Sequence, residues 1–433
     1  METEARRVFA KAARRLIPFM ALLYLVSFLD RVNVGFAALT MNKELGFSPE
    51  VYGFGAGIFF FGYFLFEVPS NIILEKVGAR LWICRIMLTW GAVSMATAFV
   101  QGASSFYVLR FSLGLAEAGF FPGMVLYLTY WFPSATRARF ISLFLAAVPL
   151  ANVIGGPVSS YILGTEVYFG LRGWQWLFLL EGLPSVLLGF AVLARMPDRP
   201  SAAKWLTSDE KSVVEAALAE EPHRQHTKLW PMLRDRRVWL LALPDFGIVL
   251  GLYGLNLWLP QMVKEMGFSN FETGFVVAAP YLASAVVMVL WGMSSDARGE
   301  RIWHIALAAL LGAGGLVGAA LLHSPLGILI ALTAAACGIY AALAVFWTLP
   351  TSFLGGTAAA GGIALINSIS NTGGFFGPFL MGWLKQHTGG YSAGLAVLAA
   401  GLVGAAILVV AIGRTLSFDG RARAMEKLTR INA

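Results

Sequence analysis

Charged side chains are scarce in this chain. Asp, Glu, Lys and Arg make up 13% of its 433 residues, whereas hydrophobic residues make up 58%. A soluble domain carries about 25% charged residues, so the composition excludes an ordinary soluble protein. The longest polar stretch is the segment near 196–237, which leaves no room for a soluble catalytic domain.

Cysteine and histidine are also sparse, with two and five residues. Cys84 and Cys337 fall in or beside apolar stretches, where neither is placed for a disulfide or a metal site. His223 and His226 are too isolated to form a metal site. Because no metal cluster or activated nucleophile is indicated, we expect neither an enzyme nor a bound cofactor.

Long apolar stretches are what the chain has in abundance. Each is about 20 residues long, enough to cross a hydrocarbon core of about 30 Å as a helix. The sequence therefore predicts an all-α membrane protein with twelve transmembrane helices. We expect them near 17–39, 52–75, 81–101, 105–130, 140–163, 173–194, 238–262, 271–293, 302–322, 325–349, 361–384 and 392–413.

The basic residues are distributed unevenly between the predicted loops. On the side that holds both termini there are 26 Lys and Arg residues, and on the opposite side there are four. This bias follows the positive-inside rule and predicts a multi-pass protein of the cell (cytoplasmic or inner) membrane with both termini in the cytoplasm. The net charge of +8 therefore reflects topology, and we expect no nucleic-acid partner.

Two halves of the chain resemble each other at one fixed offset of 221 residues. The matches pair Gly46-Phe47-Ser48 with Gly267-Phe268-Ser269, Gly78-x-Arg80 with Gly299-x-Arg301, and Gly156-Pro157 with Gly377-Pro378. Parallel repeats of this type form two bundles around a central cavity. We expect six-helix bundles at 1–195 and 238–433, joined by a cytoplasmic linker at 196–237. A capping box at Thr207-Ser208-Asp209-Glu210 predicts a short amphipathic helix in that linker.

Four charged residues lie inside predicted spans: Asp30, Arg31, Arg110 and Glu117. A charge in a bilayer costs several kcal/mol at least, so such groups are usually functional. The repeat supplies a control, because the second half has uncharged residues at the equivalent positions. These are Gly251, Leu252, Ala331 and Gly338.

Two cations and two acids are the makeup of a site that binds an anion and handles protons. Arg110 and Glu117 are seven residues apart, so on a continuous helix they share a face about 10 Å apart along the axis. The predicted topology puts Asp30 and Arg31 at a comparable depth. Their contact is a hypothesis that the sequence leaves open.

The chain resembles the anion:cation symporter family of the major facilitator superfamily over nearly its whole length. The motifs that carry the resemblance are Tyr24–Asn33, Phe61-Gly62-Tyr63, Glu67–Asn71, Arg110 with Glu117–Gly123, Gly173–Trp176, Glu181-Gly182, Phe346–Pro350 and Asn371 with Gly373–Pro378. Bacterial permeases for tartrate, sugar acids and aromatic acids are the most similar group. The usual cytoplasmic Gly-x-x-x-Asp gating loop is degenerate at Glu75–Arg80 and better kept at Ser295–Arg301.

The resemblance implies roles for individual residues. Arg31 and Arg110 match arginines that hold the substrate carboxylate, and Asp30 and Glu117 match acids that take up and release protons. Tyr63 and Asn371 match positions that line the central cavity. Three further polar or aromatic residues are candidates for substrate contacts: Asn256, Trp347 and Thr348. We interpret three other intramembrane acids as structural or gating residues: Glu67, Glu181 and Asp245.

These observations predict a secondary active transporter, a functional monomer that couples protons to symport of a small carboxylate by alternating access. An anion exchanger or exporter is an alternative from the same fold. A sensor that binds an organic acid and signals to a partner is an alternative from another class. The identity of the carboxylate and sodium as the coupling ion stay open.

Overall fold

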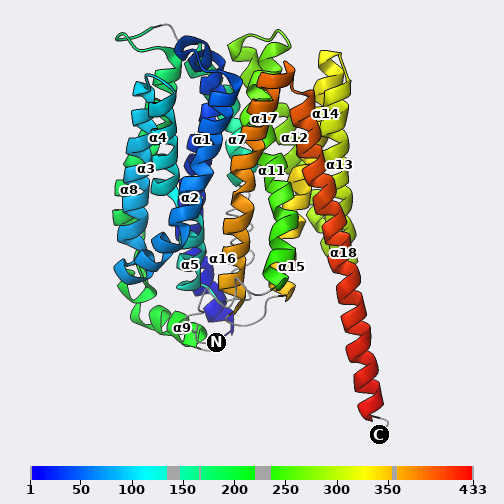
Figure 1. Cartoon of the computed structure of the whole chain (residues 1–433). Helices are drawn as coiled ribbons and strands as arrows, with labels where there is room; N and C mark the ends of the chain where they lie inside the picture. Colours follow the sequence, from blue (N-terminus) through cyan, green and yellow to red (C-terminus); the bar gives the residue numbers. More distant parts are fainter. Residues whose placement is uncertain (1, 134–146, 165–166, 220–235, 354–357, 432–433) are drawn as a thin grey trace. The chain divides into compact units, whose positions relative to one another are not determined.

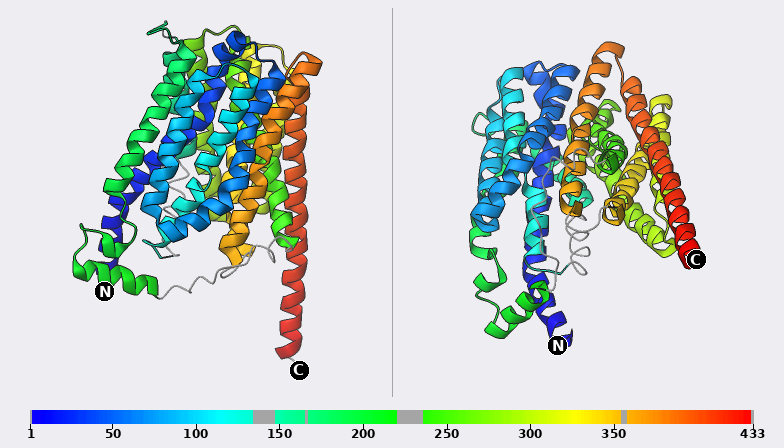
Figure 2. Two further views of the ribbon diagram at one scale, coloured as in Figure 1. Left: turned by 60° about the vertical axis from the view of Figure 1, so that its left-hand side comes forward. Right: turned by 60° about the horizontal axis from the view of Figure 1, so that its bottom comes forward.

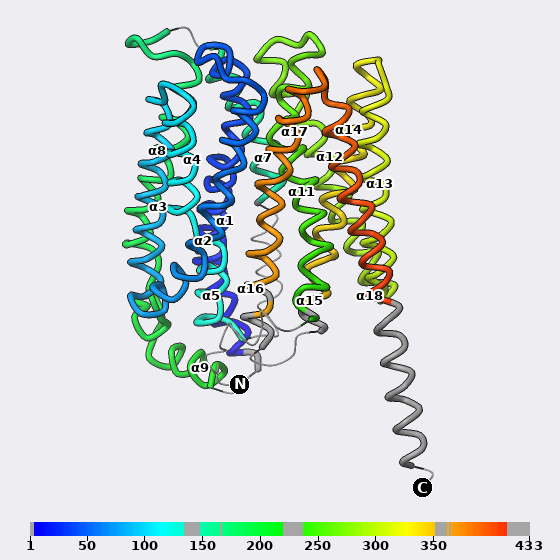
Figure 3. Tube along the Cα trace, in the orientation of Figure 1, coloured from blue at the N-terminus to red at the C-terminus, as the bar shows by residue number. Residues whose placement is uncertain are grey.

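In the described ranges of the computed structural model, the regular secondary structure is helical apart from one isolated β-bridge (Figures 1 and 3). It describes residues 2–133, 147–164, 167–219, 236–353 and 358–431.

The helices of the first half are α1 (Glu2–Leu45), α2 (Pro49–Val77), α3 (Ala79–Ala96), α4 (Ala103–Glu117), α5 (Phe120–Thr129), α7 (Ala147–Leu163), α8 (Gly173–Arg195) and α9 (Ser208–Ala219). Those of the second half are α11 (Arg236–Glu265), α12 (Asn270–Arg298), α13 (Ile302–Leu321), α14 (Pro325–Phe346), α15 (Thr348–Phe353), α16 (Ala358–Asn371), α17 (Gly373–Thr388) and α18 (Ser392–Ile431). Short 3₁₀ turns at Thr97–Phe99 and Pro200–Ala202 follow α3 and α8.

Every predicted span corresponds to a helix or a pair of helices. Ten described segments are long and apolar enough to cross a membrane, and α7 is a shorter apolar helix. The predicted span 361–384 is divided between α16 and α17. The fold class is thus confirmed, with one difference in length: α1 and α18 extend well beyond their apolar stretches.

The described chain divides into two compact units that do not coincide with the halves of the sequence. The first comprises Met1–Gln225 with Gly254–Leu282 and Pro378–Gly390, so it includes parts of α11, α12 and α17. In it, α2 packs on α4, α3 packs on α8, and α1 packs on both α7 and α8 (Figure 1). In the second unit, α13 packs on α14 and α18. The predicted division at 195 and 237 stays a prediction, because 220–235 lie outside the described residues.

The repeated glycines have a physical reason in the backbone. Gly46 and Gly267 both have positive φ, of 66° and 100°, and so do Gly78 and Gly299, at 97° and 61°. Glycine adopts this region without a steric penalty, so it marks the turns between helices. The serine that follows each Gly-Phe pair caps the next helix, since its hydroxyl accepts a backbone N–H at 3.2 Å in both halves.

A short helix, α9, lies across the end of the upright helices beside the N-terminal end of α1 (Figure 2). Its capping box is formed: Thr207 Oγ1 accepts the N–H of Glu210 at 3.2 Å, and Glu210 accepts the N–H of Thr207 at 2.9 Å. Lys11 of α1 forms an ion pair with Glu210 at 2.6 Å and lowers the pKa of that carboxyl. The contact attaches α9 to the start of the chain.

A carboxylate from a distant part of the sequence contacts the degenerate loop at Glu75–Arg80. Asp198, three residues beyond the end of α8, accepts the backbone N–H of Arg80 at 2.8 Å. The side chain thus lies at the N-terminal end of α3, where a negative charge is favourable. In the better-kept copy, the local Asp296 pairs with Arg301 at 2.6 Å.

Two contacts between helices of the first unit are made through glycine. A Cβ added to Gly53 of α2 would lie 2.5 Å from the carbonyl oxygen of Pro378 in α17. A Cβ added to Gly156 of α7 would lie 2.5 Å from the carbonyl oxygen of Gly274 in α12. These distances are below van der Waals contact, so the helix backbones approach as closely as they do only because side chains are missing. We call them the glycine contacts.

Candidate functional site

Close packing of α2 on α4 positions Arg110. A Cβ on Gly114 would lie 1.9 Å from the carbonyl oxygen of Phe59, and one on Gly62 would lie 2.4 Å from that of Phe111. Arg110 is one turn before Gly114 on α4, and its Nη2 donates to the carbonyl of Ala56 on α2 at 3.3 Å. The side chain is thereby held between the two helices, with 1% of the residue exposed.

The chain breaks helical geometry immediately after Glu117. Ala118 is extended, Gly119 is left-handed with φ of 84°, and α5 begins at Phe120. A Cβ on Gly119 would lie 2.3 Å from Ser70 Oγ, so both its conformation and its space favour glycine. The predicted span 105–130 is present, but its helical geometry is interrupted at Ala118 and Gly119. Glu117 is fully buried at the end of α4.

Arg31 of α1 and Glu117 of α4 form a buried ion pair between Nη2 and Oε1. Ser27, one turn earlier on α1, donates to the same oxygen at 3.3 Å. The hypothesis that the two spans meet is therefore correct for this pair. A guanidinium is suited to such a place because it stays charged and its planar fork matches a carboxylate.

Aromatic rings surround the two arginines. The Arg31 guanidinium carbon lies 5.2 Å from the Phe28 ring centre and 5.5 Å from that of Tyr63, a predicted site residue. The Phe59 ring centre is 5.4 Å from Arg31 and 5.2 Å from Arg110, so one ring contacts both cations. Such contacts are favourable for a desolvated cation. Phe59 was not predicted from the sequence, because a phenylalanine in an apolar span carries no polar signal.

Several polar atoms of the site are left without hydrogen bonds. Among the described residues, Nε and Nη1 of Arg110 and Oε2 of Glu117 are buried and have no partner. Native proteins rarely leave such atoms unsatisfied, and each instance needs an explanation. Free N–H groups of a buried guanidinium form charge-assisted hydrogen bonds with the oxygens of a carboxylate. The arrangement can therefore bind a carboxylate at Arg110, beside the pair of Arg31 and Glu117.

The side chain of Asp30 points in a different direction from that of Arg31. Its carboxylate accepts hydrogen bonds from Ser94 of α3 at 2.9 Å and Ser185 of α8 at 2.6 Å, and the residue is fully buried. Neighbouring residues on an α-helix point about 100° apart, so α1 directs Arg31 to α4 and Asp30 to α3 and α8. The structure thus brings three of the four charged residues around Phe59 and places Asp30 apart from them.

The predicted substrate-contact residues from the second half of the sequence lie in both compact units. Asn256 belongs to the first unit, where its Oδ1 accepts the hydroxyl of Tyr281 at 2.8 Å. In the second unit, Trp347 is the C-cap of α14, with its ring centre 5.8 Å from that of Phe346. Thr348 donates to the carbonyl of Val345 at 2.7 Å, and Asn371 is the last residue of α16. Their roles in substrate contact stay predictions.

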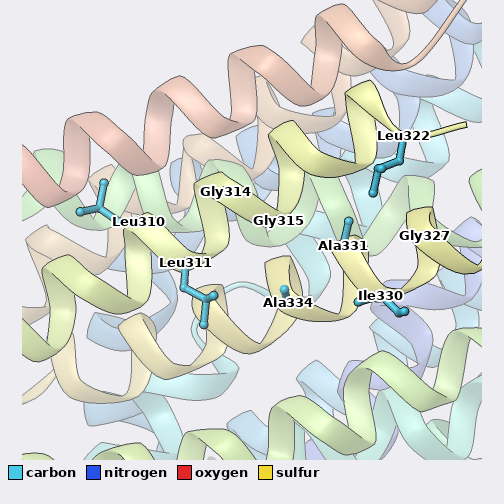
Figure 4. Close-up of a pocket in the computed structure, with 9 residues that line it drawn as sticks. All are labelled: Leu310, Leu311, Gly314, Gly315, Leu322, Gly327, Ile330, Ala331 and Ala334. Carbon is cyan, nitrogen blue, oxygen red and sulfur yellow. The ribbon is translucent and has the colours of Figure 1, made fainter.

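A pocket between α13 and α14 does not belong to this site (Figure 4). Its lining consists of Leu310, Leu311, Gly314, Gly315, Leu322, Gly327, Ile330, Ala331 and Ala334. It offers no charged or polar side chain to a carboxylate, and apolar linings of this kind suit lipid chains. In the part of the chain that the structure describes, no three His, Cys, Asp or Glu residues gather as a metal site requires.

Comparison with known proteins places the chain in a family. The profile of the Major Facilitator Superfamily matches residues 20–378. A protein of Agrobacterium vitis, named provisionally as a tartrate transporter, is 51% identical over 418 residues, which cover 96% of each chain. A quinolone resistance transporter of Acinetobacter baumannii is 45% identical over 386 residues, covering 88% of this chain and 89% of its own.

A solved structure has the same fold. A bacterial homologue of the human lysosomal transporter Spinster aligns with a TM-score of 0.75 and 16% identity, over 92% of this chain and 96% of its own. Together with the family match, this confirms the resemblance drawn from the motifs of the sequence. The chain belongs to the Major Facilitator Superfamily and is a secondary transporter, not an enzyme.

Proposed function

We propose that the protein imports a small carboxylate together with protons, and that Arg110 binds the carboxylate. The observation that carries the proposal is a fully buried guanidinium with two unsatisfied nitrogens, close to a second arginine that is paired with an acid. The name of the Agrobacterium relative supports tartrate as the first substrate to test. The number of charges in the site supports a dicarboxylate, for the reason given in the next paragraph.

The local charge of the site changes with the protonation of Glu117. When Glu117 is ionised, it neutralises Arg31, and only the charge of Arg110 is available. When Glu117 is protonated, its negative charge no longer offsets Arg31, and the two guanidinium groups together attract two negative charges. A dicarboxylate such as tartrate supplies these two charges. We therefore propose that proton binding at Glu117 prepares the site for a dianion.

The release step is the reverse exchange. Loss of the proton restores the carboxylate of Glu117, which competes with the substrate for Arg31. The pair re-forms, one arginine is withdrawn from the substrate, and the anion dissociates. Because the buried pair and the substrate complex are alternatives at the same guanidinium, proton and anion movements are linked.

The orientation in the membrane is part of the proposal. The excess of Lys and Arg on one side supports cytoplasmic termini, and the bacterial relatives support a location in the inner membrane. The remaining candidates of the second half, Trp347, Thr348 and Asn371, are proposed to contact the part of the substrate beyond its carboxylate. We propose that the monomer is the functional unit.

Uptake of radiolabelled tartrate into proteoliposomes tests the proposal. An inward proton gradient is expected to drive accumulation above the outside concentration, whereas a sodium gradient at equal pH is not. If uptake occurs only with an unlabelled anion inside, the protein is an exchanger. The name of the Acinetobacter relative makes outward transport a second candidate, which inverted vesicles test. Saturable binding without any flux supports a sensor instead.

The glycine contacts yield a prediction about alternating access. The change Gly156→Val places a branched side chain against the carbonyl of Gly274, so α7 and α12 have to separate. Overpacking costs about 1–3 kcal/mol, and we expect the described arrangement to lose population by roughly 5- to 100-fold. Spin labels at Tyr161 of α7 and Phe271 of α12, both exposed, report the separation as a longer distance between labels.

The matched control is Gly292→Val on the same helix α12. A Cβ at Gly292 meets no atom within 4 Å, so this change is expected to leave the label distance as it is. The labels require a background in which Cys84 and Cys337 are replaced by serine. An unchanged distance distribution in the Gly156 variant contradicts the role of the glycine contacts.

A further inference from the structure

A second group of acids lies on the α3, α7 and α8 side of α1, away from the arginines. Glu181 of α8 is 6% exposed, and its Oε1 accepts the hydroxyl of Ser159 from α7 at 2.6 Å. Asn33 of α1 is within hydrogen-bonding contact of Glu181, and its Nδ2 donates to Asp30 Oδ1 at 3.4 Å. The amide of Asn33 therefore connects the two carboxyl groups.

Two acceptor atoms in this group are unsatisfied. Glu181 Oε2 and Asn33 Oδ1 are buried and have no hydrogen-bond partner among the described residues. While Glu181 is ionised, its carboxylate has no hydrogen to donate, and an amide oxygen never donates, so both oxygens lack a donor. A proton on Glu181 Oε2 would turn this atom into a hydroxyl donor, for which Asn33 Oδ1 is an unsatisfied acceptor on the contacting side chain.

The charges around the pair agree with a neutral Glu181. Asp30 receives donors from Ser94 of α3, Ser185 of α8 and Asn33, which is the environment of an ionised carboxylate. Glu181 receives donors from Ser159 and Asn33, and the charged group that acts on it is the acid Asp30. Burial of a second negative charge without a cation costs several kcal/mol.

The other charged groups near the pair belong to the substrate site. Glu117 and Arg110 of α4 both interact electrostatically with Asp30, and α3 presents Ser94 and Trp90 to it. Arg31, the next residue of α1, is paired with Glu117. Asp30 and Glu181 thus take their hydrogen bonds from α1, α3, α7 and α8, whereas Arg31 is directed to α4.

We propose that Glu181 is a proton-carrying carboxyl of this transporter, held beside the ionised Asp30 by contacts of both carboxyl groups with Asn33. Its role in coupling rests on the proposed function. Loss of the proton leaves two buried carboxylates beside each other, which favours movement of α1 away from α7 and α8. Because Asp30 and Arg31 are consecutive, that movement also shifts Arg31 at the substrate site. The assignment revises the structural role that the sequence suggested for Glu181.

Infrared spectroscopy of the purified protein in lipid tests the proton directly, without transport. Spectra recorded as pH rises are expected to lose a C=O stretching band of a buried protonated carboxyl. Glu181→Gln should remove one such band, and Asn33→Val should shift it to higher frequency because its acceptor is gone. Glu215→Gln, which removes an exposed carboxyl of α9, should leave the band in place. A band unchanged in both the Glu181 and Asn33 variants overturns the proposal.

Transport by the same variant separates this inference from the proposed function. Glu181→Gln is expected to lower the number of protons carried per anion by one while tartrate affinity changes by no more than about threefold. If the wild type accumulates tartrate and Glu181→Gln carries the same number of protons per anion, Glu181 has no role in coupling and the proposed function stands. If the wild type shows no proton-driven uptake but the band is lost in Glu181→Gln, the proposed function fails and the proton site remains.

Discussion

Tartrate binding to the Arg110→Ala variant is expected to be at least about 100-fold weaker than binding to the wild type. In the proposed complex, the wild type makes two charge-assisted hydrogen bonds to the substrate that the variant cannot make, together worth about 3 kcal/mol or more. Its folding should be little affected, because Arg110 makes one hydrogen bond, to Ala56, among the described residues. Isothermal titration calorimetry and thermal unfolding of the same preparation measure the two effects separately.

Two further variants control this prediction. Arg110→Lys keeps the charge but loses the planar fork, so its affinity is expected to lie between those of the wild type and the alanine variant. Arg85→Ala removes a different arginine that also stacks on an aromatic ring, 4.6 Å from Trp82, and should bind tartrate normally. Tartrate affinity within threefold of wild type in Arg110→Ala means that the substrate binds elsewhere.

The second large effect is expected for Glu117→Gln. Glutamine has nearly the same shape as protonated glutamate, and its oxygen still accepts from Arg31 and Ser27. It cannot become a carboxylate, however, so it cannot compete with the substrate for Arg31. Net uptake of tartrate against its own concentration gradient should fall to the background of vesicles without protein. Exchange of labelled for unlabelled tartrate should continue at a rate within about fivefold of wild type.

Uptake and exchange have to be measured in the same vesicles to make this test sharp. Ser27→Ala is the matched control variant, because it removes one hydrogen bond to Glu117 and leaves its titratable carboxyl group in place. It should retain uphill uptake. Accumulation by Glu117→Gln that still depends on the proton gradient contradicts the role assigned to the Arg31–Glu117 pair.

Much of the architecture followed from the sequence because it depends on patterns that repeat. Apolar length predicted the spans, and the glycines at the 221-residue offset predicted turns that the backbone indeed makes with positive φ at Gly46, Gly78, Gly267 and Gly299. Helical periodicity also placed Arg110 and Glu117 on one helix, and α4 does contain both. These features depend on local geometry, which a sequence encodes directly.

Features that depend on contacts between distant segments were less predictable. The break at Gly119 depends on Ser70 from α2, and the carboxylate at the start of α3 comes from Asp198, which lies 118 residues beyond Arg80. The direction of Asp30 depends on serines of α3 and α8. A sequence identifies the charged residue in each case, but only the packing of the helices shows which partner it has.

The most direct test of the central claim is the acidification of proteoliposomes that contain a pH-sensitive dye, after tartrate is added outside. Proton entry with the anion through the Arg31–Glu117 and Arg110 site predicts a fall of luminal pH with the wild type. It predicts no fall with Arg110→Ala or with Glu117→Gln. Uptake of tartrate by the wild type at constant luminal pH, or acidification that persists in Glu117→Gln, would contradict the claim.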